Sequence, residues 1–184
     1  MLEDVKARFP EYAKDIKLNF SSILSGSGTP GLDQPLVYAI AYACAYASRH
    51  DSLAADIEAE AGDALNADLK RAALAAVAVM SMNNIYYRFL HLTSDASFKS
   101  MPAKLRMNVI ANPGIEKKDF ELLSLAISAI NGCGMCIDAH VQELRKAGAS
   151  AEAIQSAVRI AAVVHAAAVT LELAGNREST HQAA

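Results

Sequence analysis

Residues Glu121–His140 read ELLSLAISAINGCGMCIDAH, an apolar helical run followed by a turn and two closely spaced cysteines. Asn131 and Gly132 combine a helix-stopping with a helix-starting signal, which predicts that Cys133 and Cys136 open a new helix. At a helix N-terminus, free backbone N–H groups and the macrodipole favour the thiolate form of a cysteine. The sequence therefore predicts a reactive thiol at this point.

A histidine follows the two cysteines on the same predicted helix. Cys133, Cys136 and His140 fall at positions i, i+3 and i+7, which share one helix face. Cys136 lies one turn, roughly 6 Å, from His140, whereas Cys133 lies two turns, roughly 10 Å, away. We therefore expect His140 to deprotonate Cys136. Cys133, at the edge of the helix, is the sulfur that we expect an incoming reductant to reach.

Composition limits the class of protein. The chain has 184 residues, 53% of them hydrophobic, which suits one domain spanning residues 1–184. A formal charge of −3 and a pI near 5.9 predict no nucleic-acid partner and no basic membrane-binding face. The N-terminus has no apolar signal core, so we expect a soluble cytoplasmic protein. In a reducing cytosol, a close CxxC pair is more often catalytic or metal-binding than a structural disulfide.

Hydrophobic spacing predicts an all-α protein. No stretch shows sustained period-2 alternation of β-branched residues. The predicted helical stretches are residues 2–24 (one broken helix or two short ones), 34–62, about 66–92, 101–110 after a polar break at 94–100, and the helix that carries Glu121 after the Asn112-Pro113-Gly114 turn.

The two halves of the chain, about residues 34–92 and 120–175, resemble each other when one is shifted by 86 residues. Gly62 then falls on Gly148, and each is a predicted helix C-cap. The first half lacks the thiols in this register: Ala47 lies opposite Cys133, His50 opposite Cys136 and Ala54 opposite His140. We interpret this as a diverged internal duplication with its chemistry in the second half.

Three interpretations compete for Cys133, Cys136 and His140. The first interpretation is that these are small buried residues and a hydrogen-bonded core histidine, but two cysteines beside glycines at a helix start are a poor choice for packing alone. Zinc needs four ligands, and no second CxxC or HxxxH lies nearby. A dithiol redox centre needs only an activated thiolate, a neighbour to close the disulfide and a base within one turn. The sequence favours a redox centre, either oxidoreductase or peroxidase, with a zinc-binding or thiol-sensor module as the alternative.

The other reactive residues receive simpler interpretations. Cys44, in AYACAYA, is predicted to be a small buried hydrophobe. His165 is predicted to be a packed, hydrogen-bonded core or interface residue. His50, His91 and His181 have no other candidate catalytic residues near them in the sequence. Glu121 alone would be a solvated charge near a helix start. Thioredoxin-like proteins are excluded by fold class, because they hold their CxxC in a βαβ sheet.

The motif Glu121-x11-Cys133-x2-Cys136-x3-His140 resembles the signature of the alkyl hydroperoxide reductase D family, the alkylhydroperoxidases of the carboxymuconolactone decarboxylase-like fold. The opening PEYAKDIKLNFSSIL and the duplicated helical layout are similar as well. The resemblance implies an all-α fold with two pseudo-repeated helical halves. One position departs from the family pattern, because Met135 stands where well-known members have a histidine.

The resemblance also implies a function and site roles. It implies a homotrimeric antioxidant peroxidase that reduces organic hydroperoxides, supports a partner peroxiredoxin and binds no cofactor of its own. Electrons would come from the dihydrolipoamide of a lipoylated acyltransferase, recharged by dihydrolipoamide dehydrogenase. Glu121, His140 and Cys136 would form a proton relay, with Cys136 peroxidatic and Cys133 resolving. A general disulfide reductase and a ring-opening or decarboxylating lyase are the enzymatic alternatives, and the CxxC argues against the lyase.

Overall fold

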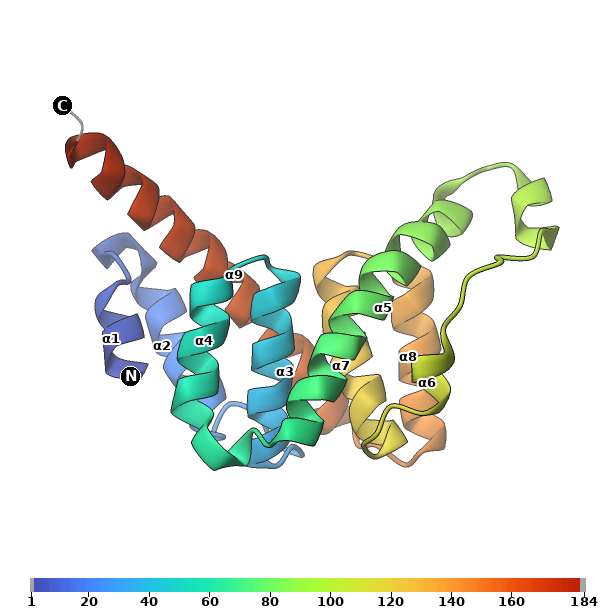
Figure 1. Cartoon of the computed structure of the whole chain (residues 1–184), viewed down its shortest axis with the longest axis horizontal. Helices are drawn as coiled ribbons and strands as arrows, with labels where there is room; N and C mark the ends of the chain where they lie inside the picture. The colour runs from blue at the N-terminus through green and yellow to red at the C-terminus, as the bar shows by residue number, and fades with distance from the viewer. Residues whose placement is uncertain (1, 183–184) are drawn as a thin grey trace.

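The computed structural model describes residues 2–182, with side chains described for residues 3–175. Within this range the chain forms only helices, which confirms the all-α prediction (Figure 1). They are α1 (Leu2–Ala7), η1 (Glu11–Ala13), α2 (Lys14–Leu24), α3 (Gln34–Ala47), α4 (Asp51–Ala61), η2 (Gly62–Ala64), α5 (Ala67–Leu92), η3 (Ala96–Ser100), α6 (Asn108–Ala111), α7 (Lys117–Ile130), α8 (Gly134–Lys146) and α9 (Ala151–Gln182), where η marks a 3-10 helix.

Two predicted helices differ from those observed. The stretch 34–62 is divided by a turn at Ser48–His50, where Arg49 has φ 59° and so leaves the helical conformation. The predicted helix at 101–110 is reduced to the short α6. Pro102 disfavours helical backbone at the residue before it, and Met101 is extended with φ −83° and ψ 138°. The broken N-terminal helix and the long α5, capped by Asn66, are as predicted.

Helix α7 lies at the centre of the fold. It packs against α3, α5, α8 and α9, and its residues 120–128 are all buried. A helix that is buried on every side must be apolar all round, which explains the continuous run LLSLAISAI. The functional groups carried by α7 and α8 are therefore held by the packed core.

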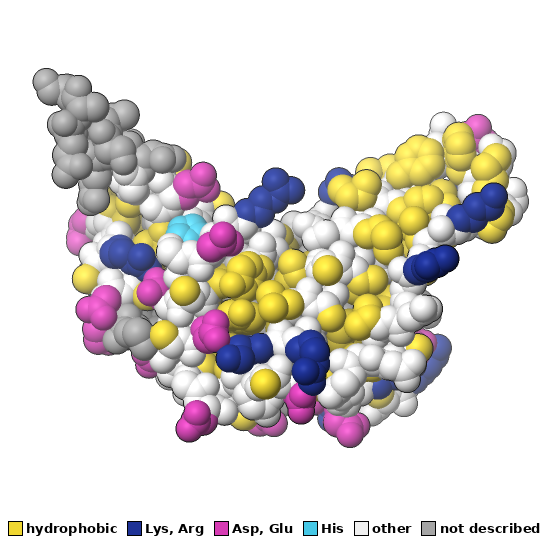
Figure 2. All heavy atoms as spheres, in the orientation of Figure 1, with side chains coloured by type: hydrophobic (Ala, Val, Ile, Leu, Met, Phe, Trp, Pro, Cys, Tyr) yellow, Lys and Arg dark blue, Asp and Glu magenta, His cyan; other side chains and the backbone are white. Residues whose placement is uncertain are grey.

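The last turns of α5 extend away from the rest of the molecule, and η3 lies at their end (Figure 1). Hydrophobic side chains gather along this arm in Figure 2. The exposed apolar residues here include Ile85, Phe89, Leu92 and Met101, and the Phe89 ring packs edge-on against Phe98 with centroids 5.1 Å apart. The arm thus exposes apolar surface of the kind that marks an interaction site.

Helix α9 is long and apolar enough, by length and composition, to cross a membrane between Ala151 and Gly175. In this structure 44% of its most apolar window is buried, and the helix packs against α2, α3 and α7. These contacts are those of a core helix.

The two halves place their helices in equivalent order, but not in the predicted register. Helices α3 and α7 begin 83 residues apart, at Gln34 and Lys117, and α4 and α8 begin 83 residues apart, at Asp51 and Gly134. The shift of 86 residues is therefore wrong at the thiol turn. The helix ends, Ala61 and Lys146, lie 85 residues apart because α8 is two residues longer than α4, and the left-handed Gly62 and Gly148 that follow lie 86 apart because Gly62 is the C-cap of α4 whereas Gly148 follows the C-cap of α8. The duplication itself stays a prediction.

Candidate functional site

The turn between α7 and α8 positions the two cysteines. Cys133 N–H donates to the Ser128 carbonyl at 3.1 Å, and Gly132 N–H donates to the Ala129 carbonyl at 3.2 Å. These two bonds form a Schellman motif, which requires a left-handed residue after the helix end, and Gly132 supplies it with φ 66°. The motif ends α7 and delivers the chain directly to Cys133 at the start of α8.

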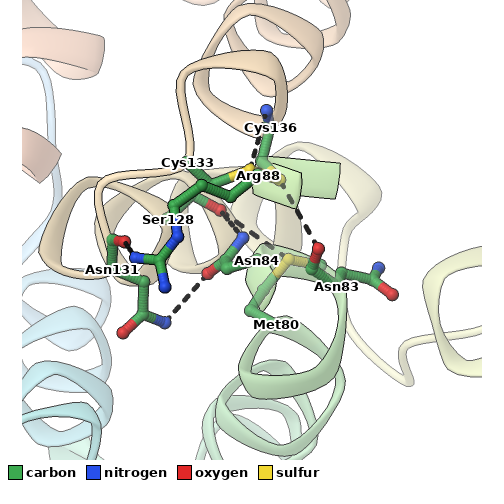
Figure 3. The surroundings of a disulfide bond; sticks show 8 residues. All are labelled: Met80, Asn83, Asn84, Arg88, Ser128, Asn131, Cys133 and Cys136. Atoms are coloured by element: carbon green, nitrogen blue, oxygen red, sulfur yellow. Dashed lines mark hydrogen bonds between the residues drawn. A yellow bond between two sulfur atoms is a disulfide. The ribbon is translucent and has the colours of Figure 1, made fainter. Parts of the chain in front are cut away.

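Cys133 is the N-cap of α8, as the sequence predicts for a helix opened by the cysteines. Its Sγ accepts a hydrogen bond from the Cys136 backbone N–H at 3.4 Å. Cys133 and Cys136 form a disulfide, with their Cα atoms 5.3 Å apart (Figure 3). The pair is thus bonded in an oxidised state, at a helix end whose N–H groups favour negative charge on sulfur after reduction.

The turn in the first half is built in the same way without thiols. Arg49 takes the left-handed position, and His50 caps α4 through its Nδ1, which accepts from Leu53 N–H at 3.2 Å. His50 therefore corresponds to Cys133, rather than to Cys136 as predicted.

Glu121 and His140 form a direct hydrogen bond. His140 Nδ1 lies 2.6 Å from Glu121 Oε2, and the two residues are 9% and 5% exposed. Glu121 is therefore not a solvated charge, as it would be if it stood alone. In a neutral imidazole, a Nδ1–H that donates to the carboxylate leaves the Nε2 lone pair free to accept a proton. The pair has the arrangement of a base and the group that orients it.

A cavity of about 290 Å³ opens beside this pair. It is lined by Met80, Asn83 and Tyr87 of α5, Met107 and Ile110 near α6, and Met135, Cys136, Ala139 and His140 of α8. Most of these side chains are apolar, and Cys136 and His140 are the two lining residues that the sequence predicts as site residues. The cavity can hold a small apolar molecule next to one sulfur and one imidazole.

Cys136 is the accessible member of the cysteine pair. It lines the cavity and is 6% exposed, whereas Cys133 is fully buried. Cys133 is therefore not the exposed helix-edge residue that the sequence predicts, and which sulfur a reductant attacks first stays a prediction. The cause of the burial is the Schellman turn, which folds the N-cap residue against the end of α7 instead of leaving it frayed.

A polar network, buried at Asn84 and Ser128 and half-buried at Arg88 and Asn131, fixes the turn to α5 (Figure 3). Asn84 donates to Ser128 Oγ at 2.9 Å and accepts from Asn131 Nδ2 at 2.9 Å, and Arg88 donates to the Asn131 carbonyl at 2.7 Å. The sequence motif does not include Asn84 or Arg88. The available signal is the pair Asn83-Asn84 within the mainly apolar stretch from Ala72 to Tyr87, since buried amides need partners.

The remaining cysteine and histidines lie outside this cluster. Cys44 is buried as predicted, and burial raises the pKa of its thiol. His165 is exposed rather than packed in the core, although its Nδ1 lies 3.1 Å from Ser48 Oγ. The exposed His91 has Nε2 3.9 Å from where a Cβ on Gly134 would lie, which places it beside the start of α8. The side chain of His181 falls outside the described residues.

Among the described residues, no three His, Cys, Asp or Glu side chains are grouped so that they could hold a metal ion. The chemical capacity of the site is instead a dithiol–disulfide pair, a carboxylate-oriented imidazole and an apolar cavity. These parts can form and break sulfur–oxygen and sulfur–sulfur bonds.

Comparison with known proteins identifies relatives along the whole chain. The model of the carboxymuconolactone decarboxylase family matches residues 96–175. The chain is 54% identical to the alkyl hydroperoxide reductase AhpD of Rhodospirillum centenum, with 100% of this chain and 99% of the relative covered. It is 51% identical to the AhpD of Brucella canis and 50% identical to that of Methylocella silvestris, with 94% of this chain and 97% and 96% of those relatives covered.

Mild oxidation should close only one disulfide. We expect Cys133 and Cys136 to cycle between dithiol and disulfide while Cys44 stays reduced, because Cys44 is buried and the raised pKa of its thiol keeps it protonated. Mass spectrometry after peroxide treatment and alkylation checks this. A disulfide that contains Cys44 as the main product would contradict it.

Asn84→Leu should destabilise the protein by about 2–3 kcal/mol, because it removes the donor to the buried Ser128 Oγ and the acceptor of the half-buried Asn131 amide. Urea unfolding followed by circular dichroism measures this change. The exposed Asn19→Leu is the control and should change the free energy of unfolding by less than about 0.5 kcal/mol. Equal effects of the two substitutions would show that the network does not hold the turn.

Proposed function

The chain belongs to the AhpD alkyl hydroperoxide reductases of the carboxymuconolactone decarboxylase family, and on this premise we propose that it is an antioxidant peroxidase that reduces organic hydroperoxides at Cys133 and Cys136. The observation that carries the proposal is the buried Glu121–His140 pair beside the cavity that His140 and Cys136 line. An apolar cavity with one nucleophilic sulfur and one base suits a substrate with an apolar body and a weak O–O bond.

In the reduced enzyme, His140 Nε2 takes the proton of the Cys136 thiol while Glu121 holds the ring through Nδ1. The Cys136 thiolate attacks the terminal oxygen of the hydroperoxide. A sulfur–oxygen bond forms, the O–O bond breaks, and the leaving alkoxide takes the proton from His140. Sulfur is oxidised to a sulfenic acid, and the hydroperoxide is reduced to an alcohol.

The second step closes the disulfide. The Cys133 sulfur attacks the Cys136 sulfenic acid, and water leaves. The Cα separation of 5.3 Å lies within the range that a disulfide spans. As a thiolate, Cys133 keeps the hydrogen bond from Cys136 N–H, so the N-cap position also favours Cys133 as the leaving group when the disulfide is reduced.

Reduction of the disulfide needs an external dithiol, which we propose to be the dihydrolipoamide of a lipoylated acyltransferase, recharged by dihydrolipoamide dehydrogenase. A dithiol that enters the cavity meets Cys136 first, because Cys133 is buried. The reduced pair would also pass electrons to a partner peroxiredoxin. We place this cycle in the cytoplasm.

We further propose that the active protein is a homotrimer. The support for self-association is the exposed apolar surface of the α5 arm, where Ile85, Leu92 and Met101 are each more than half exposed. Burial of such surface contributes roughly 25 cal/mol per Å².

The function is tested by hydroperoxide consumption with dihydrolipoamide as the reductant, compared with other dithiols. Glu121→Gln and His140→Gln should lower turnover on the order of 10²–10⁴-fold, since each removes part of the base. The rate of thiol-dependent turnover and the melting temperature are measured together, so that loss of fold is recognised. Near-wild-type turnover in either variant would remove that residue from the relay, and stoichiometric zinc in the purified wild type would favour a zinc-binding module instead.

Single-cysteine variants separate the roles of the two sulfurs. Cys133→Ser should react once with hydroperoxide and stop at a sulfenic acid, because no thiol remains to close the disulfide. Cys136→Ser should lose even this first oxidation, because the remaining thiol is buried away from the cavity. Dimedone labels sulfenic acids and reports the difference by mass. A dimedone adduct on Cys133 in the Cys136→Ser variant, with none on Cys136 in the other, would reverse the assignment.

A further inference from the structure

Asn83 is the one cavity residue with a buried polar side-chain atom that lacks a hydrogen-bond partner in the described part of the chain. It is 5% exposed, and its Oδ1 accepts no hydrogen bond. Its neighbour Asn84 is also buried, but the Asn84 amide donates to Ser128 Oγ and accepts from Asn131 Nδ2. Figure 3 shows the two side chains leaving α5 in different directions, with Asn84 directed toward Ser128 and Asn131 and Asn83 directed away from them.

An unpaired buried amide oxygen is costly to keep. Loss of its hydration destabilises a fold by roughly 1–3 kcal/mol when nothing replaces it. Core packing gives no reason for an amide at this position, since Met80 and Tyr87, one turn before and after it on the same face of α5, are large and mainly apolar. Such a group is explained if a ligand completes its hydrogen bond.

Asn83 also lies close to the reacting sulfur. Its backbone carbonyl oxygen is 4.0 Å from Cys136 Sγ, and Asn83 lines the same cavity as Cys136 and His140. A molecule that sits against Cys136 and extends along the cavity therefore meets Asn83. The unfilled requirement is for a hydrogen-bond donor, because the unpaired atom is an acceptor.

The walls restrict the ligand further. The methionine, isoleucine and alanine side chains of the wall disfavour a highly charged ligand. Among the cavity-lining residues, His140 is the one that acts as the base. An organic hydroperoxide has a single donor, the O–H of its O–O–H group, on an apolar body. That donor belongs to the oxygen that the Cys136 thiolate attacks.

We propose that Asn83 Oδ1 accepts a hydrogen bond from the hydroperoxide O–H and so orients the O–O bond toward Cys136 Sγ, which makes Asn83 a substrate-binding residue of the site. This inference rests on the proposed peroxidase function. The chemistry is that of the first step above: the Cys136 thiolate takes the terminal hydroxyl, and the alkoxide leaves and is protonated from His140. Asn83 adds no proton or electron; it fixes the direction of approach.

The test is rapid mixing of the fully reduced protein with cumene hydroperoxide, followed to the disulfide, for wild type, Asn83→Leu and Asn83→Ala. Both variants should lower the second-order rate constant about three- to tenfold, the effect of one neutral hydrogen bond. Leucine fills the space of the asparagine side chain and alanine does not. A lower rate constant in both variants therefore reports the loss of the amide rather than a change in the shape of the cavity. Oxidation of the same dithiol by diamide, which has no O–H donor, should keep its wild-type rate.

Ser124→Ala is the matched control. Ser124 is the other described residue with a buried, unpaired side-chain oxygen, and it does not line the cavity. Its substitution, like Asn83→Leu, should leave the melting temperature equal to or above that of wild type, because an unpaired polar atom is removed. Only the Asn83 variants should slow the reaction with hydroperoxide.

The outcomes that overturn the inference are distinct from failure of the proposed function. Wild-type rates in both Asn83 variants would mean that water alone satisfies the amide. Equal slowing with hydroperoxide and diamide would mean that the substitution disturbs the thiols and not substrate binding. A wild-type protein that diamide oxidises but cumene hydroperoxide does not would overturn the peroxidase proposal, and this inference with it.

Discussion

The hydrogen bond of 2.6 Å between Glu121 Oε2 and His140 Nδ1 is the interaction on which the site depends. It joins α7 to α8 inside the core, where a carboxylate without a partner would strongly destabilise the fold. Because both residues are buried, the imidazole is held in one orientation. Cys136 lies one turn before His140 on α8, and the cavity gives a ligand access to Cys136 and His140. Fold stability and the ability to activate a thiol therefore rest on the same contact.

Local sequence was sufficient to predict the elements that carry this contact. Asn131-Gly132 specifies the end of α7, because glycine accepts the left-handed backbone that the Schellman motif needs, and the cysteines follow as the start of α8. The motif formed by Glu121, Cys133, Cys136 and His140 could be found from spacing and resemblance. The break after Ala47 was missed because Arg49, unlike glycine, gives no signal of a left-handed residue.

Residues supplied by α5 could not be predicted in this way. Asn83 and Asn84 lie more than 40 positions before the cysteines, and only the packing of α5 against α7 and α8 brings them to the thiol turn. The relative burial of the two sulfurs is also a tertiary property, which is why Cys133 was wrongly expected to be the accessible one. Met135, between the two cysteines, lines the cavity and adds a thioether to its apolar wall.

The central claim is that the hydroperoxide oxidises this cysteine pair directly, and a single-turnover stoichiometry tests it most directly. Fully reduced protein is mixed with one equivalent of cumene hydroperoxide without any reductant, quenched with acid, and assayed for the alcohol product and for the Cys133–Cys136 disulfide. The account predicts one molecule of alcohol and one disulfide for each hydroperoxide consumed, because two thiols supply the two electrons. Consumption of hydroperoxide without formation of this disulfide, or no consumption by the reduced protein, would contradict it.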